Sequence, residues 1–198
     1  MLPLTGPRPC DLAQVVAALH KGAVVGLPTD TVYGLAADPF SKEAMGALFA
    51  LKGRAVVKPV ALLAASAEHA ARIGIIAGAA LEAARAHWPG PLTIVVPRVV
   101  GLPDWVGDPA RDSVGLRVPD HSAALALLAA AGPLAVTSAN RSGESPARDD
   151  AAARAMFGAR VAAYLPGSGS DVEPSTVVDF TGAKPRVLRS GPVAWEEG

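Results

Sequence analysis

The chain has 198 residues, of which 51% are hydrophobic and 18% are charged, and its 18 basic residues balance its 18 acidic residues. This composition excludes a disordered chain, and the length suits one domain with a sizeable core. The zero net charge excludes a polycation, so binding of phosphate or nucleic acid must come from a local patch. The single cysteine, Cys10, excludes an internal disulfide framework and a cysteine-cluster zinc site, which fits a reducing compartment.

Two features bear on localisation. Residues 1–7 lack the basic and apolar regions of a signal peptide. The longest uncharged run, residues 122–140, is interrupted by Gly132 and Pro133, so we interpret it as a helix, a turn and a strand rather than a membrane span. We therefore predict a cytoplasmic protein without membrane contact.

Helical stretches recur along the chain. Asp11 caps a helix that Gly22 ends, and Ser41 caps a second helix that ends at Lys52. Further helices are predicted at residues 66–72, 77–87 and 119–131, with a short one through residues 156 and 157.

Strands alternate with these helices. They are predicted at residues 23–26, 60–63, 92–96, 113–118, 134–137, 174–180 and 186–189. Because the last two have no helix between them, we predict one α/β domain with a mixed sheet rather than a purely parallel one. The tail, residues 190–198, is predicted to be exposed.

The first polar cluster follows the first strand. Thr29, Asp30, Thr31 and Tyr33 precede Gly34 in a turn-like stretch. Polar residues at the end of a buried strand are where α/β folds place ligands. The alternative is an ordinary turn in which these side chains satisfy their own backbone.

Two later stretches have a similar character. The loop after the second helix carries the cations Lys52, Arg54 and Lys58 and no acid, although a charge run is usually a solvated surface. Ser138 and Asn140 come directly after a predicted strand. These residues add cations, a hydroxyl and an amide to the candidate site.

Several common sites are absent from the sequence. It contains no G-x-x-x-x-G-K-[ST] loop, no G-x-G-x-x-G and no G-x-S-x-G elbow. No metal-ligand spacing is found among the four histidines, which are His20, His69, His87 and His121. A serine hydrolase that pairs Ser138 with Lys52 or Lys58 is conceivable, but nothing specific supports it.

The remaining candidate site residues carry hydroxyls, one amide and cations. Its members are Thr29, Thr31, Ser138, Ser175, Thr176, Asn140, Lys52, Arg54, Lys58, Arg117 and Arg189. Cations and hydroxyls without paired acids or histidines suit phosphate and carboxylate groups, and phosphoryl or nucleotidyl transfer needs such positioning. The residues alone therefore predict a nucleotide- or phosphoester-binding site.

Seven motifs in order carry a family resemblance. They are P-T-D-T-V-Y-G-L at residues 28–35, K-x-R with K-P at 52–59, W-P-G-P-L-T at 88–93, R-V-P-D-H at 117–121, T-S-A-N-R-S-G at 137–143, P-S-T-V-V-D at 174–179 and R-S-G at 189–191. Across residues 10–193 the chain resembles YrdC-type L-threonylcarbamoyladenylate synthases.

The resemblance implies a YrdC/DHBP-synthase-like domain at residues 10–193, an exposed tail at 194–198 and no second domain. It implies a large twisted mixed sheet surrounded by helices, with a deep basic cavity. It implies that L-threonine, bicarbonate and ATP yield threonylcarbamoyl-AMP and pyrophosphate, a nucleotidyl transfer that requires Mg²⁺ held by ATP rather than by protein side chains. The product would feed N6-threonylcarbamoyladenosine (t6A) formation in tRNA by a separate transferase complex, with possible direct contact to tRNA or double-stranded RNA.

The resemblance also assigns residues. Catalytic roles fall to Lys52 and Arg54. Threonine binding falls to Thr31 and Arg117. ATP binding falls to Arg54, Lys58, Ser138, Asn140 and Arg189. Cavity positions without a definite role fall to Thr29, Tyr33, Ser175 and Thr176.

The sequence departs from the family pattern at Ala55, Leu63 and Pro174, where proline, histidine and glutamate are common, and the last two departures concern threonine contact. Two alternatives stay open. One is a non-catalytic RNA-binding protein of the same fold, and the other is a related carbamoyl-adenylate enzyme.

Overall fold

A computed structural model describes residues 11–53, 59–170 and 173–195 of the chain. The described residues form six α-helices, one short 3₁₀ helix (η1, Gly158–Arg160) and nine strands. The helices are α1 (Leu12–His20), α2 (Lys42–Lys52), α3 (Ala67–Ala70), α4 (Ala79–His87), α5 (Ser122–Ala131) and α6 (Asp150–Phe157). All six occur where the sequence predicts helices.

The strands form one mixed sheet in the order β7-β1-β2-β6-β3-β5-β4-β8-β9. They are β1 (Val25–Leu27), β2 (Gly34–Ala37), β3 (Ala61–Leu63), β4 (Leu92–Pro97), β5 (Ser113–Arg117), β6 (Leu134–Ser138), β7 (Ala163–Tyr164), β8 (Thr176–Asp179) and β9 (Arg186–Arg189). The pairs β1/β7, β3/β5 and β4/β8 are parallel and the others are antiparallel. The predicted mixed α/β fold is confirmed.

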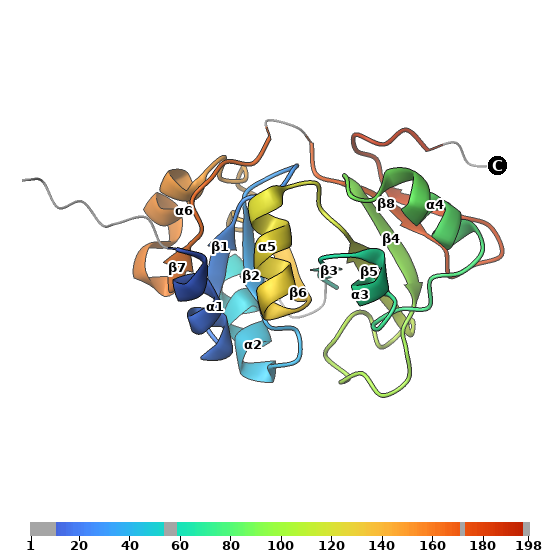
Figure 1. The fold of residues 1–198 in the computed structure, drawn as a ribbon, viewed down its shortest axis with the longest axis horizontal. Coiled ribbons are helices and arrows are strands. Elements are labelled where there is room, and N and C mark those ends of the chain that lie inside the picture. Colours follow the sequence, from blue (N-terminus) through green and yellow to red (C-terminus); the bar gives the residue numbers. More distant parts are fainter. Residues whose placement is uncertain (1–10, 54–58, 171–172, 196–198) are drawn as a thin grey trace, which may run out of the picture.

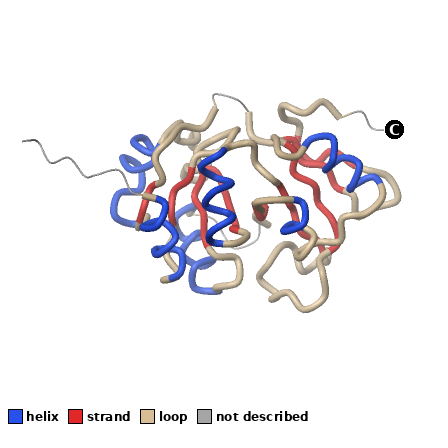
Figure 2. Tube along the Cα trace, viewed as in Figure 1, coloured by secondary structure: helices blue, strands red, loops and turns tan. Residues whose placement is uncertain are grey.

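The two faces of the sheet have separate apolar cores. Val25, Leu27 and Leu63 pack with α1 and α5 on one face. Leu62, Ile94 and their neighbours pack on the other face with residues of α2, α4 and α6. Figure 1 shows α1, α2, α5 and α6 gathered around one end of the sheet and α3 and α4 at the other end. Figure 2 shows the same division, with most helices beside the strands of the first end.

Helix ends follow the predicted capping residues. Asp11 accepts a hydrogen bond from the Gln14 backbone, and Gln14 reciprocates, forming a capping box. Ser41 accepts from Ala44 at the start of α2, and Gly53 ends this helix in the left-handed conformation, with φ of 61°. These local signals explain why the boundaries near residues 11 and 53 could be predicted.

Two strands were not predicted. β2 is the run Gly-Leu-Ala-Ala, whose small residues have low strand propensity, and all four residues are buried. β7 has only two residues and pairs in parallel with β1. Both owe their conformation to neighbouring strands, which the local sequence does not reveal.

Residues 191–195 of the predicted tail are partly exposed, and two of them pack against the domain. The Thr176 hydroxyl donates to the Val193 carbonyl and accepts from its N–H, at 2.9 and 3.0 Å. The Trp195 ring meets Phe180 edge-to-face at 5.4 Å between centroids. The segment therefore packs along β8, because its apolar side chains cover apolar surface there.

The helices of the described segments are short relative to a bilayer. None of their helices is both long enough and apolar enough to cross a bilayer.

Candidate functional site

A cavity of about 410 Å³ lies on one face of the sheet. Helices α1 and α5 cover the same face, but only at the other end of the sheet. Alternate residues of the central strands line the cavity. They include Ala61 and Leu63 of β3, Thr93 and Val95 of β4, Ser113, Gly115 and Arg117 of β5, and Ser175 and Val177 at β8. Because successive strand side chains point to opposite faces, the residues between them pack into the other core. The cavity floor is therefore one face of the sheet.

The turn after β1 closes one end of the cavity. The Thr29 hydroxyl donates to the Val32 carbonyl at 2.7 Å and accepts from the Thr31 backbone at 3.2 Å. Ser170 donates from outside to the carbonyls of Asp30 and Thr31. Thr29 lines the cavity, as expected, yet its hydroxyl also satisfies the turn, as the alternative interpretation held.

Arg117 reaches this turn from β5. Its Nε donates to the Gly90 carbonyl at 3.0 Å, Nη1 to the Thr31 hydroxyl at 3.0 Å and Nη2 to the Asp30 carboxylate at 2.5 Å. Burial lowers the pKa of the Arg117 guanidinium, and the charge and hydrogen bond of Asp30 oppose this shift. The structure thus brings together Thr31 and Arg117, two residues that the sequence assigned to one ligand.

A second guanidinium projects into the same cavity from β9. Arg189 donates to the carbonyl and the hydroxyl of Ser175, both at 3.0 Å, and the Ser175 hydroxyl lies 2.8 Å from that of Thr93. Although the residue as a whole is exposed, partial burial and then the charge of Arg117 lower the pKa of Arg189. Two cations that repel each other across a cavity favour an anionic ligand between them.

The loop between β4 and β5 supplies a third cation. Arg111 lines the cavity and donates to Asp179 at 2.8 Å. The other oxygen of this carboxylate accepts from the backbone and hydroxyl of Thr181. Burial raises the pKa of Asp179, but the bonds from Thr181 and Arg111 outweigh it, so the pKa lies below its ordinary value.

Lys52 occupies a different environment from the one expected. It is 1% exposed and is not among the cavity-lining residues. Its Nζ donates to the Ser138 carbonyl and to the Asn140 Oδ1, both at 2.6 Å, and lies 3.4 Å from the Ser138 hydroxyl. An ammonium that donates to several acceptors does not act as a base, which argues against a Ser-Lys hydrolase.

Asn140 is satisfied within the same cluster. Its Oδ1 accepts from Lys52 and Ser138, and its Nδ2 donates to the carbonyls of Arg141 and Glu144. Ser138 lines the cavity, but Asn140 does not. The cluster therefore holds the loop after β6 and presents only Ser138 to a ligand.

Two of the predicted cavity positions are corrected by the structure. Tyr33 is fully buried, donates to the Leu165 carbonyl at 2.8 Å and does not line the cavity, and burial raises the pKa of its phenol. Thr176 lies on the opposite face of β8 from Ser175 and bonds to Val193. Side chains alternate between the two faces of a strand, which explains why Thr176 faces away from the cavity while Ser175 lines it.

Other positions were not predicted or are not described. Arg54 and Lys58 fall outside the described residues, whereas Ser138, Ser175 and Arg189 line the cavity. The lining residues that the sequence interpretation missed include Thr93, Asp108, Arg111, Ser113 and Thr137. Ser113 could have been predicted, because it lies four residues before Arg117 on the same strand and its side chain therefore points to the same face.

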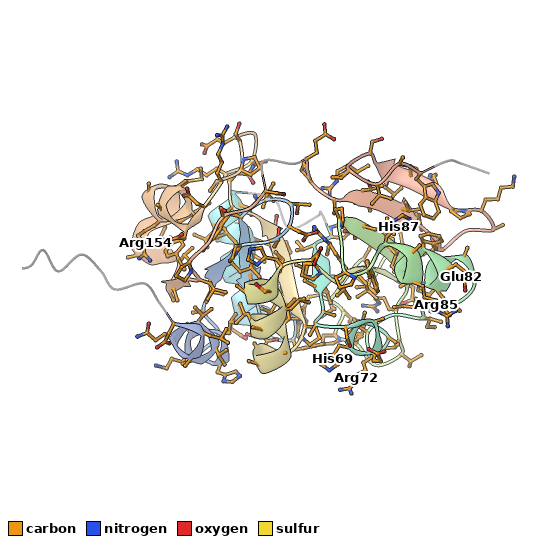
Figure 3. All side chains as sticks on the ribbon, turned by 45° about the horizontal axis from the view of Figure 1, so that its top comes forward. His69, Arg72, Glu82, Arg85, His87 and Arg154 are labelled. Atoms are coloured by element: carbon orange, nitrogen blue, oxygen red, sulfur yellow. The ribbon has the colours of Figure 1, made fainter. Side chains whose placement is uncertain are left out.

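Six other ionisable residues lie away from the cavity. Figure 3 places His69, Arg72, Glu82, Arg85 and His87 on and beside α3 and α4, and Arg154 on α6. Arg85 pairs with Glu82 at 3.1 Å, and Arg154 lies over the Tyr164 ring. None of these six lines the cavity. Within the described ranges, no group of three or more acidic, histidine or cysteine side chains could hold a metal ion.

The sequence matches known proteins over most of its length. The family model named for Sua5, YciO and YrdC, described as "Telomere recombination", matches residues 17–191. A Mycobacterium tuberculosis protein, provisionally named a threonylcarbamoyl-AMP synthase, is 43% identical over 96% of this chain and 88% of its own length. The threonylcarbamoyl-AMP synthase of Halorhodospira halophila is 39% identical over 87% of this chain and 91% of its own length.

A solved structure agrees with the sequence relationship. The crystal structure of P. abyssi Sua5 complexed with L-threonine superposes with a TM-score of 0.83 at 30% identity, over 93% of this chain. This chain spans only 56% of that protein, so the match concerns just over half of Sua5. The family match and the shared fold lead to one conclusion: the chain belongs to the Sua5/YciO/YrdC family.

Proposed function

We propose that the chain is an enzyme, a threonylcarbamoyl-AMP synthase. The overall reaction takes L-threonine, bicarbonate and ATP to threonylcarbamoyl-AMP, pyrophosphate and water. Two relatives carry the name of this activity, and a structural relative was crystallised with L-threonine. These names favour the synthase over the alternatives of an RNA-binding protein without activity or another carbamoyl-adenylate enzyme.

The observation that carries the proposal is the Arg117–Thr31 pair in the cavity. A guanidinium has five N–H groups, and Arg117 uses three of them on Gly90, Thr31 and Asp30. The unused N–H groups suit the carboxylate of an amino acid, and the adjacent Thr31 hydroxyl suits its side-chain hydroxyl. A single strand and a single turn thus supply both groups that L-threonine needs.

Nucleotide binding uses the rest of the cavity. Ser138 and Arg189 line it, and the family resemblance adds Arg54 and Lys58 for the phosphates. The threonine amine forms a carbamate, whose oxygen attacks the α-phosphorus while the bond to pyrophosphate breaks. Oriented binding of two anions removes about 7–11 kcal/mol of such a barrier. Lys52 acts in this scheme through Ser138, which it positions, rather than by touching the substrate.

Mg²⁺ enters with ATP in this proposal. The described side chains offer no acidic cluster for a resident ion, and Mg²⁺ commonly uses substrate phosphates with few protein ligands. Bound there, it would neutralise the charge that develops on the phosphates. The cavity residues orient the triphosphate, and their cations add to this neutralisation.

The product is a labile mixed anhydride, so a second enzyme must consume it. We propose that a separate transferase complex moves the threonylcarbamoyl group to tRNA to give t6A. Direct contact of this chain with tRNA stays a prediction. The cytoplasm is the compartment in which these substrates meet.

One assay tests the activity. Purified protein with Mg²⁺, ATP and bicarbonate should release pyrophosphate only when L-threonine is added, and mass spectrometry should detect threonylcarbamoyl-AMP. Reactions without bicarbonate, or with L-alanine in place of L-threonine, are the controls. Pyrophosphate release that does not depend on threonine would sink the proposal.

A further inference from the structure

The cavity is long in the direction of β5. Ser113, Gly115 and Arg117 line its floor at alternate positions. At about 3.3 Å per residue, Ser113 lies about 13 Å from Arg117 along the strand. Under the proposed function the reacting carbamate lies near Arg117, so the α-phosphate is at that end. The base is the part of ATP farthest from the reacting phosphorus, and it therefore falls toward Ser113.

The cavity surface near Ser113 suits the adenine base of ATP. Val95 lines the cavity there, opposite Gly115, and supplies apolar area for a ring, while Gly115 itself leaves the floor without a side chain. Two charged residues of the β4–β5 loop, Asp108 and Arg111, complete the lining. An apolar pocket with a few polar groups is the usual design of a nucleotide-base site.

These two charges differ in their partners. Arg111 donates to Asp179. In the part of the chain that the structure describes, the Asp108 carboxylate has no hydrogen bond or ion pair, although three arginines line the same cavity. The Asp108 carboxylate is partly exposed, so water can serve it in the free protein, and a donor on a ligand can replace that water.

The Asp108 backbone is fixed, which limits the region that its carboxylate can reach. Its N–H and C=O bond to the C=O and N–H of Ser113 at 2.7 and 3.1 Å. Gly107 precedes it with φ of 76°, and a Cβ there would lie 2.5 Å from the Ser113 carbonyl oxygen. Arg98 donates to two carbonyls of the loop, those of Pro103 and Val106, and to Asp112. The loop, yellow-green in Figure 1, is thereby tied to both strands that it joins.

We propose that Asp108 reads the adenine base by accepting a hydrogen bond from its exocyclic amino group. Adenine presents an amino donor at position 6, whereas guanine presents an oxygen acceptor there. A carboxylate accepts only, so at position 6 it pairs with the adenine amino group and opposes the guanine oxygen. Discrimination of this kind is strong, because the wrong base leaves a polar group unpaired.

The test is nucleotide binding without threonine or bicarbonate, measured by calorimetry on the full chain with Mg²⁺. Wild type should bind ATP at least about tenfold more tightly than GTP, as expected for one hydrogen bond to a charged group. Asp108→Ala should weaken ATP binding by about tenfold and should not weaken GTP binding. Asp108→Asn, which can also donate, should bring the two affinities together.

A ligand that lacks the amino group sharpens the test. Purine riboside triphosphate should bind wild type about tenfold more weakly than ATP and should bind Asp108→Ala as tightly as ATP does. Removing the carboxylate and the amino group together then weakens binding no more than removing either one alone, which identifies a direct contact between them. The matched control is Asp112→Asn on the same loop, whose side chain is 79% exposed and pairs with Arg98.

Other outcomes overturn the assignment. Equal losses for ATP, GTP and purine riboside triphosphate in Asp108→Ala would place the carboxylate on the ribose or on Mg²⁺. An equal effect of Asp112→Asn would mean that loop structure is responsible. Wild type that does not distinguish ATP from GTP would refute base reading while leaving the synthase intact. Base reading without threonine-dependent pyrophosphate release would uphold Asp108 and refute the synthase.

Discussion

Two buried cations, Lys52 at the end of α2 and Arg117 at the end of β5, have different surroundings. Lys52 donates to the Ser138 carbonyl and to Asn140 and lies outside the cavity lining. Arg117 is similarly buried, but it lines the cavity and keeps N–H groups that no described residue uses. From sequence both were candidates for function.

A structural cation and a ligand-binding cation can be told apart from the partners of their N–H groups. Burial and positive charge are common to both residues, so neither property decides. What decides is whether donors are left over on the side that faces a cavity. Lys52 fixes the loop that presents Ser138, while Arg117 is held by Asp30 and Thr31 in a position where a carboxylate can reach it.

Removing the charges of the Arg117 site should have the largest effect on activity. Arg117→Ala alone would leave Asp30 buried without its partner, which destabilises the fold. The double variant Asp30→Asn/Arg117→Gln removes both charges together. Each hydrogen bond to a charged group contributes about 1.5–3 kcal/mol, so kcat/KM for L-threonine should fall at least about a hundredfold. Steady-state pyrophosphate release measures it.

Its control is the affinity for ATP without threonine, which should change less than about threefold. Unchanged threonine kinetics in a folded double variant would show that Arg117 does not hold the substrate. A collapse of Tm would make the pair structural, as Lys52 is in our interpretation.

Lys52→Met is the counterpart on the other side of the comparison. It removes a donor from the Ser138 carbonyl and Asn140 while keeping an apolar stem of similar length, so unfolding free energy should drop by about 2–3 kcal/mol. Urea denaturation measures this loss. If stability is kept and turnover vanishes, Lys52 is catalytic, as the family resemblance indicates.

A smaller effect separates two neighbours on β8. Ser175→Ala removes the hydroxyl shared by Arg189 and Thr93, and ATP affinity should weaken about fivefold, as for one hydrogen bond of about 1 kcal/mol. Thr176→Ala is the matched control, since its hydroxyl bonds to Val193 on the opposite face. That variant should lose stability and keep its ATP affinity. The reverse pattern would contradict the assignment of faces.

The sequence allowed much of the fold to be predicted, because its signals are local. Capping by Asp11 and Ser41 and the apolar periodicity of the helices depend on nearby residues. β2 and β7 could not be predicted in the same way. Their residues become strands through pairing, and the partners in β1/β7 and β2/β6 lie far apart in the chain.

The candidate site was predictable in part for the same reason. Thr31 and Arg117 were identified from motifs and meet at 3.0 Å. The sequence did not say that Thr176 faces away from the cavity, because the motif does not fix which strand residue points inward. Asp108 lies in a loop without a motif, and only the bridge to Ser113 brings it to the cavity. The face to which a strand residue points, and the distant segments that pair, are set by the tertiary structure rather than by the local sequence.

The smallest expected effect concerns Asp179, which holds Arg111 much as Asp30 holds Arg117. Its folded pKa lies below the ordinary value of 3.8, so the ionised carboxylate stabilises the fold above that value. This contribution is lost as the pH falls through the folded pKa. Asp179→Asn should therefore lower the free energy of unfolding by about 1 kcal/mol or less at pH 7, and the difference from wild type should shrink below about pH 4. Urea denaturation at pH 7, 5 and 3.5 measures it, with Asp112→Asn as the exposed control. A difference that stays constant with pH would mean that the ionised form of Asp179 has no special role, and that Arg111 is held by shape rather than by charge.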